Sequence, residues 1–226
     1  MKNRIGEGLL RFWAADRGLS LFLFLLIAVV FVLPVFSRLG PLGSLTGDIV
    51  LSALLVAGAL TLPERRWMRW AVPPFAVIAL LIRWVSVAMD SAYLVAWREL
   101  STLVTLILFA AVVAGQVYRS GPVTYHRILG AVAVYLLLGL IWANAYGLLQ
   151  QLRPDAFAGT LNEAFISQTW IYYSFVTLTT VGYGDITPVH PVARSLAIGE
   201  ALTGQLYLAI TLARLVSLHV STRAKS

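Results

Sequence analysis

The sequence predicts an all-α membrane protein with six transmembrane helices and one re-entrant segment, a short helix followed by a loop. Of its 226 residues, 59% are hydrophobic and 12% are charged, and the mean hydropathy is +0.83. Since a soluble domain is about a quarter charged, a chain of this composition is solvated by lipid. The apolar residues also occur in runs of about twenty, long enough to cross a hydrocarbon core of ~30 Å.

The net charge of +7 could indicate a protein that binds nucleic acid. The basic residues, however, cluster in short segments between the apolar runs, which is the pattern of a positive-inside membrane protein. We therefore expect the lipid bilayer, and no nucleic acid, as a partner. The chain has no cysteine, which excludes disulfide bonds and thiolate metal sites.

The N-terminal part begins with residues 1–17, which hold four basic side chains among apolar ones. This mixture fits an amphipathic helix in the cytoplasmic interface, and a solvated tail fits it nearly as well. Residues 18–37 carry no charge. They are too long for a signal-peptide core and lack a small-x-small cleavage site, so we interpret them as a retained first span. Residues 38–47 contain a proline and three glycines, and they are predicted to be a loop.

Three further spans are predicted before residue 120. The second covers about residues 48–62, and Asp48 is expected to cap its outer end. The third, about residues 70–89, contains two consecutive prolines and an arginine, which weaken the pattern. A tight turn at Asp90 leads into the fourth span, about residues 92–117.

The C-terminal part contains two more spans on either side of the re-entrant segment. A fifth span covers about residues 128–149, and a polar, exposed, turret-like loop follows it over residues 150–167. Ser167 is predicted to cap a short helix over residues 168–179. The last span runs over about residues 191–219.

The distribution of Lys and Arg predicts the orientation in the membrane. The N-terminus, the loop 63–69, the bend 118–127 and the tail after residue 213 hold twelve of them, whereas the opposite side holds three. This asymmetry places both termini in the cytoplasm, with the re-entrant loop outside. We expect a plasma membrane, and specifically a bacterial inner membrane.

The re-entrant loop contains the run Thr180-Val181-Gly182-Tyr183-Gly184. Its two glycines can adopt φ > 0, which lets successive carbonyl oxygens point the same way. Four such loops around an axis would stack rings of carbonyl oxygens, with the Thr180 hydroxyl as a further ring. Such rings can replace the hydration shell of a potassium ion. The alternative is an ordinary Gly-Tyr-Gly turn between two elements.

This run resembles the filter of the tetrameric potassium channel superfamily, which it matches without a substitution. An aromatic-rich segment, residues 172–177, precedes the run, and Asp185-Ile186-Thr187-Pro188 follows it, as in that family. The resemblance covers roughly residues 123–219. It implies a four-helix membrane domain over residues 1–120 and a channel pore domain over residues 121–226. It also implies a homotetramer without enzymatic activity, with potassium as the permeant ligand bound at the filter residues and no cofactor.

The resemblance further implies roles for residues around the filter. Asp185 would brace the filter from behind, and Tyr172 stands at the position of its partner on the pore helix. Val176 occupies a place where some relatives have a second carboxylate, so that form of the brace is absent. Gly204 matches the glycine at which the inner helix bends in the family, although a glycine in a membrane helix is often only a close-packing contact.

Glu200 is the unusual residue of the last span, because a carboxylate at this depth is costly and usually functional. It lies one helical turn before Gly204, on the face expected to pack against the pore helix. We expect it either to form a structural hydrogen bond to a pore-helix hydroxyl or to have a role in gating. A different stripe of the same helix suits the wall of a central cavity: Ala201, Gln205, Leu208 and Leu212.

The charges of the third and fourth spans argue against a voltage sensor. Arg98 is the single arginine of the fourth span and has Glu99 beside it, so strong voltage gating is not expected. Arg83 and Glu99 lie at similar depth on either side of the turn, which predicts an ion pair between them. The alternative is that Arg83 extends alone to the outer interface.

These observations predict a potassium-selective channel that conducts passively through a tetrameric pore, without a soluble ligand-binding domain in the chain. A membrane sensor or regulatory subunit that retains the pore fold without conducting is the alternative.

Overall fold

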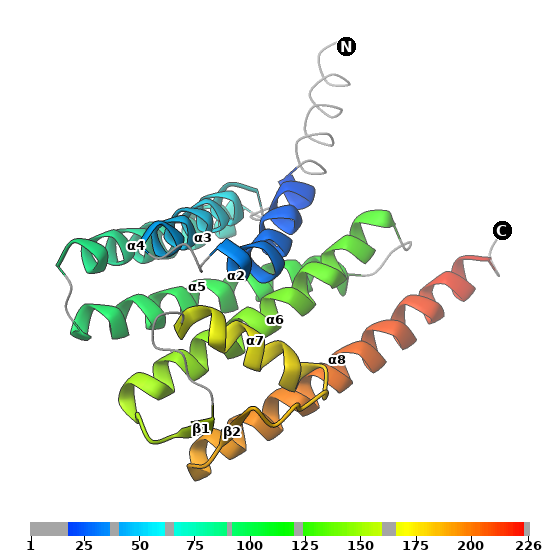
Figure 1. Ribbon diagram of the computed structural model, residues 1–226. Helices are drawn as coiled ribbons and strands as arrows, with labels where there is room; N and C mark the ends of the chain where they lie inside the picture. The colour runs from blue at the N-terminus through cyan, green and yellow to red at the C-terminus, as the bar shows by residue number, and fades with distance from the viewer. Residues whose placement is uncertain are drawn as a thin grey trace.

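The computed structural model describes residues 18–36, 41–61, 66–89, 92–119, 124–159 and 166–223. Within these ranges the chain forms long helices and one small two-stranded sheet (Figure 1). Five helices are long and apolar enough to cross a membrane, and a shorter apolar helix covers Leu45–Leu60. The all-α membrane fold is thus confirmed. After the first span, the helices are α3 (Pro41–Thr61), α4 (Arg66–Met89), α5 (Ala92–Val117), α6 (Tyr125–Leu152), α7 (Ile166–Leu178) and α8 (Pro191–Arg223).

The first span, Gly18–Val35, changes its helix type along its length. It is α-helical up to residue 27, π-helical in η1 (Ala28–Val32) and α-helical again in α2 (Leu33–Phe36). Pro34 lacks an N–H group, and in a regular α-helix its ring would clash with the carbonyl of Val30. The wider π-helical turn just before it accommodates the ring without ending the span. The predicted interfacial helix of residues 1–17 lies outside the described residues.

The second helix, α3, begins earlier than predicted. It starts at Pro41, so residues 41–47 are helical and the predicted loop is wrong at these positions. A proline is well placed in a first helical turn, because its missing N–H would have no partner there in any case. Asp48 consequently lies inside the helix, and its predicted role as a cap is wrong.

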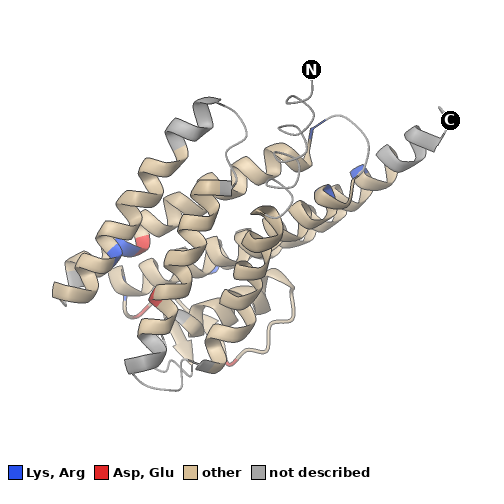
Figure 2. Ribbon diagram, turned by 90° about the horizontal axis from the view of Figure 1, so that it is seen from above, with Lys and Arg blue, Asp and Glu red and all other residues tan. Residues whose placement is uncertain are grey.

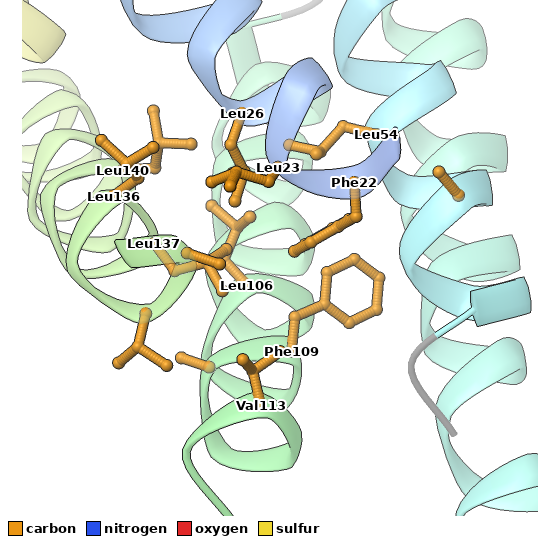
Figure 3. Packing of buried hydrophobic residues seen from close by; sticks show 14 of the residues in the cluster. Phe22, Leu23, Leu26, Leu54, Leu106, Phe109, Val113, Leu136, Leu137 and Leu140 are labelled. Carbon is orange, nitrogen blue, oxygen red and sulfur yellow. The ribbon is translucent and has the colours of Figure 1, made fainter. Parts of the chain in front are cut away.

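Buried apolar side chains from the first span and from α3, α4, α5 and α6 form the core of the N-terminal part (Figure 3). The rings of Phe22 and Phe109 meet edge to face, with centroids 5.7 Å apart. Gly58 makes room for this contact, since a Cβ on it would lie 2.3 Å from the Phe109 ring. Because lipid tails are as apolar as these side chains, close packing rather than hydrophobicity holds the helices together. The fully buried members include Phe22, Leu26, Leu54, Leu106, Phe109 and Leu137.

The short helix α7 packs against both α6 and α8, whereas much of α8 projects away from the rest of the chain (Figure 1). Within the apolar part of α8, Pro191–Ser217, only 17% of the residues are buried. Its exposed apolar side chains therefore lack a protein partner within one chain: Ile198, Leu202, Leu206, Leu208, Ile210, Leu212 and Val216.

A small antiparallel sheet joins the segment after α6 to the segment after α7. Strand β1 (Phe157–Gly159) pairs with β2 (Ile186–Pro188). Phe157 and Ala156 before it are buried, so the prediction of an exposed loop is wrong for this part of residues 150–167. Gly159 has φ of 125°, and a Cβ on it would lie 2.0 Å from the carbonyl oxygen of Asp185. Only glycine therefore fits this crossing.

The remaining boundaries differ little from the predicted ones. α7 begins at Ile166, so Ser167 lies inside the helix and not at its cap. The side chain of Ser167 and the turn at Asp90 lie outside the described residues. The helices α6 and α8 each extend a few residues beyond the predicted spans.

Candidate functional site

The candidate site is the loop that follows α7, in which the backbone dihedral angle φ alternates in sign. Thr180, Gly182 and Gly184 have φ of 59°, 58° and 80°, so every second residue is left-handed. The sequence predicted this conformation for the two glycines. It did not predict it for Thr180, where a β-branched residue with φ > 0 is an uncommon and strained choice. The two-residue period of the glycines was the signal that could have pointed to it.

The amide groups of this loop are bonded back to the end of α7. The N–H groups of Val181 and Gly182 donate to the carbonyl of Val176, at 2.9 and 3.3 Å, and the N–H of Thr180 donates to Thr177. These bonds satisfy carbonyls that a helix end otherwise leaves without partners. Among the described residues, no backbone N–H donates a hydrogen bond to a carbonyl oxygen of the loop residues 179–184. The first part of the loop thus directs its N–H donors toward α7, while the carbonyl oxygens of the loop remain available to a cation.

Within one chain, one side of the loop is open. Val181 is 52% exposed and Tyr183 is 70% exposed. A Cβ built on Gly182 or Gly184 would meet no heavy atom within 4 Å. A side chain at these glycines is therefore disfavoured by the backbone conformation, and not by a collision within the protomer.

The expected contact behind the loop is present. The hydroxyl of Tyr172 donates to Asp185 Oδ2 at 2.8 Å, and its ring stacks on that of Tyr183 with an interplanar angle of 6°. The hydrogen bond to the carboxylate raises the pKa of Tyr172 above its ordinary value of 10.0. Since a raised phenol pKa keeps the donor proton in place below about pH 10, this contact is insensitive to pH in the physiological range.

An aromatic cluster supports α7 from the side of α6 and β1. It consists of Tyr146, Phe157, Trp170 and Tyr173, and every pair of these rings has centroids between 4.7 and 6.3 Å apart. Such aromatic pairs contribute about 0.5–1.5 kcal/mol each beyond their burial. Sequence reasoning missed Tyr146, because nothing local marks which aromatic of a membrane span faces a neighbour. It missed Phe157 because residues 150–167 were predicted to be an exposed loop.

Glu200 lies fully buried where α8 meets α6 and α7. Its Oε1 is 2.5 Å from the hydroxyl of Ser174 on α7, the hydrogen bond to a pore-helix hydroxyl that the sequence led us to expect. Its Oε2 is 2.6 Å from the hydroxyl of Tyr146 on α6, a partner that was not foreseen.

Gly204 allows a close approach of α8 to the end of α7. A Cβ at this position would lie 2.1 Å from the carbonyl oxygen of Leu178. The close-packing role is therefore present, and α8 continues as a helix through this residue. Bending at Gly204 stays a prediction. Of the residues predicted to line a cavity, Gln205, Leu208 and Leu212 are exposed in one chain and Ala201 is half-buried.

The predicted ion pair between Arg83 and Glu99 is wrong. Arg83 is buried and donates from Nη1 to Asp48 Oδ1 at 2.6 Å and from Nη2 to the hydroxyl of Thr102 at 3.2 Å. Glu99 instead pairs with its neighbour Arg98 at 3.0 Å. The reason is the early start of α3, which places Asp48 beside Arg83. Extension of Arg83 to the interface is excluded by the same contacts, and Figure 2 shows how sparse charges are on these helices.

No group of three or more His, Cys, Asp or Glu in the described ranges could hold a metal ion. The carbonyl oxygens of the loop, to which no backbone N–H of the described residues donates, are candidate ligands for a cation.

Comparison with known proteins finds that the C-terminal part of the chain is similar to ion channels. Residues 134–220 match a family model described as an ion channel. The chain is 34% identical over 77 residues to the inward rectifier potassium channel Kirbac3.1 of Paramagnetospirillum magnetotacticum, covering 34% of this chain and 24% of that protein. It is 41% identical over 63 residues to two-pore potassium channel 4 of Arabidopsis thaliana, covering 28% and 22%.

A third similar protein is Protein LctB of Bacillus caldotenax, which is 37% identical over 87 residues, 36% of this chain and 64% of that protein. The chain thus spans about a quarter of the length of the first two relatives and less than two thirds of the third. No solved structure matches it significantly.

Proposed function

We propose that the chain belongs to the potassium channel superfamily and that four copies form a potassium-selective pore. The similarity of residues 134–220 to an ion channel family, and of the chain to two potassium channels, supports this proposal. In this proposal, residues Thr180–Gly184 of each copy form the selectivity filter, and ions pass passively down their gradient. The observation that carries it is the alternating backbone of the loop, whose donors are bonded to α7 while its carbonyl oxygens keep their acceptor capacity. Rings of such oxygens substitute for the hydration shell of a potassium ion.

The tetramer is supported by the surfaces that one chain leaves uncovered. The loop is open on one side, and α8 carries a long series of exposed apolar side chains. A polar path at membrane depth must be enclosed by protein, because lipid cannot satisfy irregular backbone. Four copies around an axis would enclose the loop and bring the stripe of Ala201, Gln205, Leu208 and Leu212 to a central cavity.

We further propose a location in a bacterial inner membrane with both termini in the cytoplasm. The asymmetry of Lys and Arg between the two sides supports this orientation. It places the loop at the outer face, as a potassium filter requires. Potassium is the permeant ligand in this proposal, with no resident cofactor and no enzymatic activity.

The test is a comparison of potassium and sodium flux in liposomes that contain the reconstituted protein. Gly182→Ala is expected to abolish potassium flux, because alanine opposes the φ of 58° at this position. The matched control is Gly115→Ala in α5, where an added Cβ also meets open space but the backbone is helical. That control should leave flux unchanged.

Two results would contradict the proposal. Undiminished potassium flux through Gly182→Ala would show that the loop does not line the path. An assembled wild-type protein that passes neither ion would indicate a non-conducting sensor or regulatory subunit built on the same fold.

A further inference from the structure

A chain of four polar groups crosses the interior where α6, α7 and α8 meet. The hydroxyl of Tyr146 lies 2.6 Å from Glu200 Oε2. Glu200 Oε1 lies 2.5 Å from the hydroxyl oxygen of Ser174, which in turn lies 2.7 Å from the carbonyl oxygen of Gly139. Tyr146, Ser174 and Glu200 are each fully buried. All three distances are within the range of O–H···O hydrogen bonds.

The number of protons shared by these four hydrogen-bonded groups determines the protonation state of Glu200. The hydroxyl of Ser174 carries one hydrogen, and it has two acceptors within reach, the carbonyl of Gly139 and the carboxyl of Glu200. An ionised carboxylate can only accept. With Glu200 ionised, one of the two contacts of Ser174 would bring two acceptor oxygens together without a proton between them.

A neutral Glu200 satisfies every group. Its own O–H then donates to Ser174, the hydroxyl of Ser174 donates to Gly139, and the hydroxyl of Tyr146 donates to the carbonyl oxygen of Glu200. We propose that Glu200 is a protonated carboxylic acid and a positioning residue, which relays hydrogen bonds through three helices and fixes α7 behind the filter. This inference deepens the proposed function, and the part that concerns conduction rests on it.

Among the described residues, none offers Glu200 a compensating charge. The other titratable groups that face it are the phenols of Tyr146 and Tyr135 from α6 and of Tyr173 from α7. In the part of the chain that the structure describes, the ion pairs are Arg83–Asp48 and Arg98–Glu99, and neither involves Glu200. A buried charge without a partner is costly, so the neutral acid agrees with the environment as well as with the proton count.

The position of the relay explains what it does for the filter. Glu200 contacts Ser174, and Gly204, one turn later on α8, contacts Leu178, one turn later on α7. The two helices therefore run in the same direction, with their registers matched over one turn. That turn is the last one of α7, whose carbonyls receive the N–H groups of the filter loop. The relay thereby sets the depth and rotation of the element on which the filter is built.

The proton is tested by infrared spectroscopy of the purified full-length protein at neutral pH. A protonated acid shows a C=O stretching band that ionised carboxylates lack. We expect this band in the wild type, its absence in Glu200→Gln and a shift to higher frequency in Tyr146→Phe, which removes the hydrogen bond to the C=O. A wild-type spectrum that shows no such band, or one that Glu200→Gln leaves unchanged, would overturn the neutral state. This measurement does not depend on conduction.

The positioning role is tested by flux. An amide can donate to Ser174 and accept from Tyr146, so Glu200→Gln should keep potassium flux within about twofold of the wild type. Glu200→Leu and Ser174→Ala should each lower flux by about tenfold, because each leaves a buried polar group without its partner. Ser101→Ala, whose hydroxyl bonds within α5, is the control and should have no effect.

Two outcomes would refute this role. The first is a Glu200→Leu variant that conducts as well as the wild type while assembled as a tetramer. The second is a Glu200→Gln variant that is as defective as Glu200→Leu. If the wild-type protein did not conduct, the proposed function would fail, whereas the infrared result would still decide the state of Glu200.

Discussion

At the scale of single residues, the buried ion pair between Arg83 and Asp48 makes the N-terminal helices sensitive to substitution. The two side chains are 4% and 13% exposed, and each is the charge partner of the other. Removing one member of a buried pair leaves a charge without compensation, which destabilises far more than the net contribution of the pair itself. The pair links α3 to α4, and Thr102 adds a contact from α5.

We expect Asp48→Asn and Arg83→Gln each to lower the stability of the tetramer in detergent by about 3 kcal/mol. The double variant should lose less than the sum of the two, because the second change removes the group that the first left unpaired. Thermal unfolding of the four proteins measures this coupling. Glu99→Gln is the control and should cost little, since its pair with Arg98 is partly exposed. Additive losses for Asp48 and Arg83 would mean that they do not interact.

The same pair shows what the sequence could not reveal about residues. Depth in the membrane can be counted from a turn, and it correctly placed Arg83 among buried groups that need a partner. The partner itself depended on where α3 begins and on its rotation, which are set by tertiary packing. Thr180 was missed for a related reason, since its left-handed backbone is imposed by the bonds of the loop to α7 and not by its own preference.

At the scale of elements, α7 and α8 are in close contact just before the loop that we propose as the filter. One of the contacts is the close packing of Gly204 on α8 against the carbonyl oxygen of Leu178, the last residue of α7. Backbone atoms cannot move aside as a flexible side chain can, so any larger residue at this position must separate the two helices.

Gly204→Ala is therefore expected to lower the thermal stability of the tetramer. It should also reduce potassium flux at every membrane potential and ion gradient that is applied. Gly199→Ala on the same helix is the matched control, because its Cβ would lie 3.4 Å from the Trp142 ring, an ordinary contact. Stability is read from thermal unfolding and flux from liposomes. If Gly204→Ala kept full stability and changed only the opening of the channel, a role as a hinge would account for the residue better than close packing.

The helices themselves were predictable because their apolar runs have the length of a membrane, and the spans after residue 65 agree with the prediction to within a few residues. The sheet of β1 and β2 was not. Strands of three residues carry no alternating pattern, and their pairing joins segments that are distant in the sequence. In the candidate site, the filter run and the Tyr172–Asp185 contact followed from the sequence, whereas the aromatic cluster and Tyr146 required the packing of α6 on α7.

At the scale of the whole molecule, the N-terminal helices contact the C-terminal part of the chain near the end of α8. The hydroxyls of Tyr118 and Thr211 are 2.7 Å apart, and Arg214 donates to the carbonyl of Tyr118 while lying over its ring. The division of the chain into domains 1–120 and 121–226 stays a prediction. These contacts show that the two parts meet closely whatever the boundary between them.

We expect the open probability to change little between strongly negative and strongly positive potentials. Arg98 and Glu99 are adjacent and hydrogen-bonded, so a movement of α5 would carry almost no net charge through the field. Glu99→Gln should introduce a weak voltage dependence, since one unpaired charge crossing the field corresponds to about 2.3 kcal/mol per 100 mV. Recordings in planar bilayers measure both. A steep conductance–voltage curve of the wild type would show that charge moves elsewhere in the protein.

The hydrogen bonds between the proposed filter loop and α7 also bear on how the subunits would assemble. All their donors and acceptors belong to one chain, so in the proposed tetramer each subunit would bring its quarter of the filter with its own supporting hydrogen bonds. Assembly is then the docking of prepared parts, and the loss of conformational entropy falls on the folding of the monomer and not on association. In the proposed tetramer, four such segments would then meet to complete the ring, each held by the hydrogen bonds of its own chain.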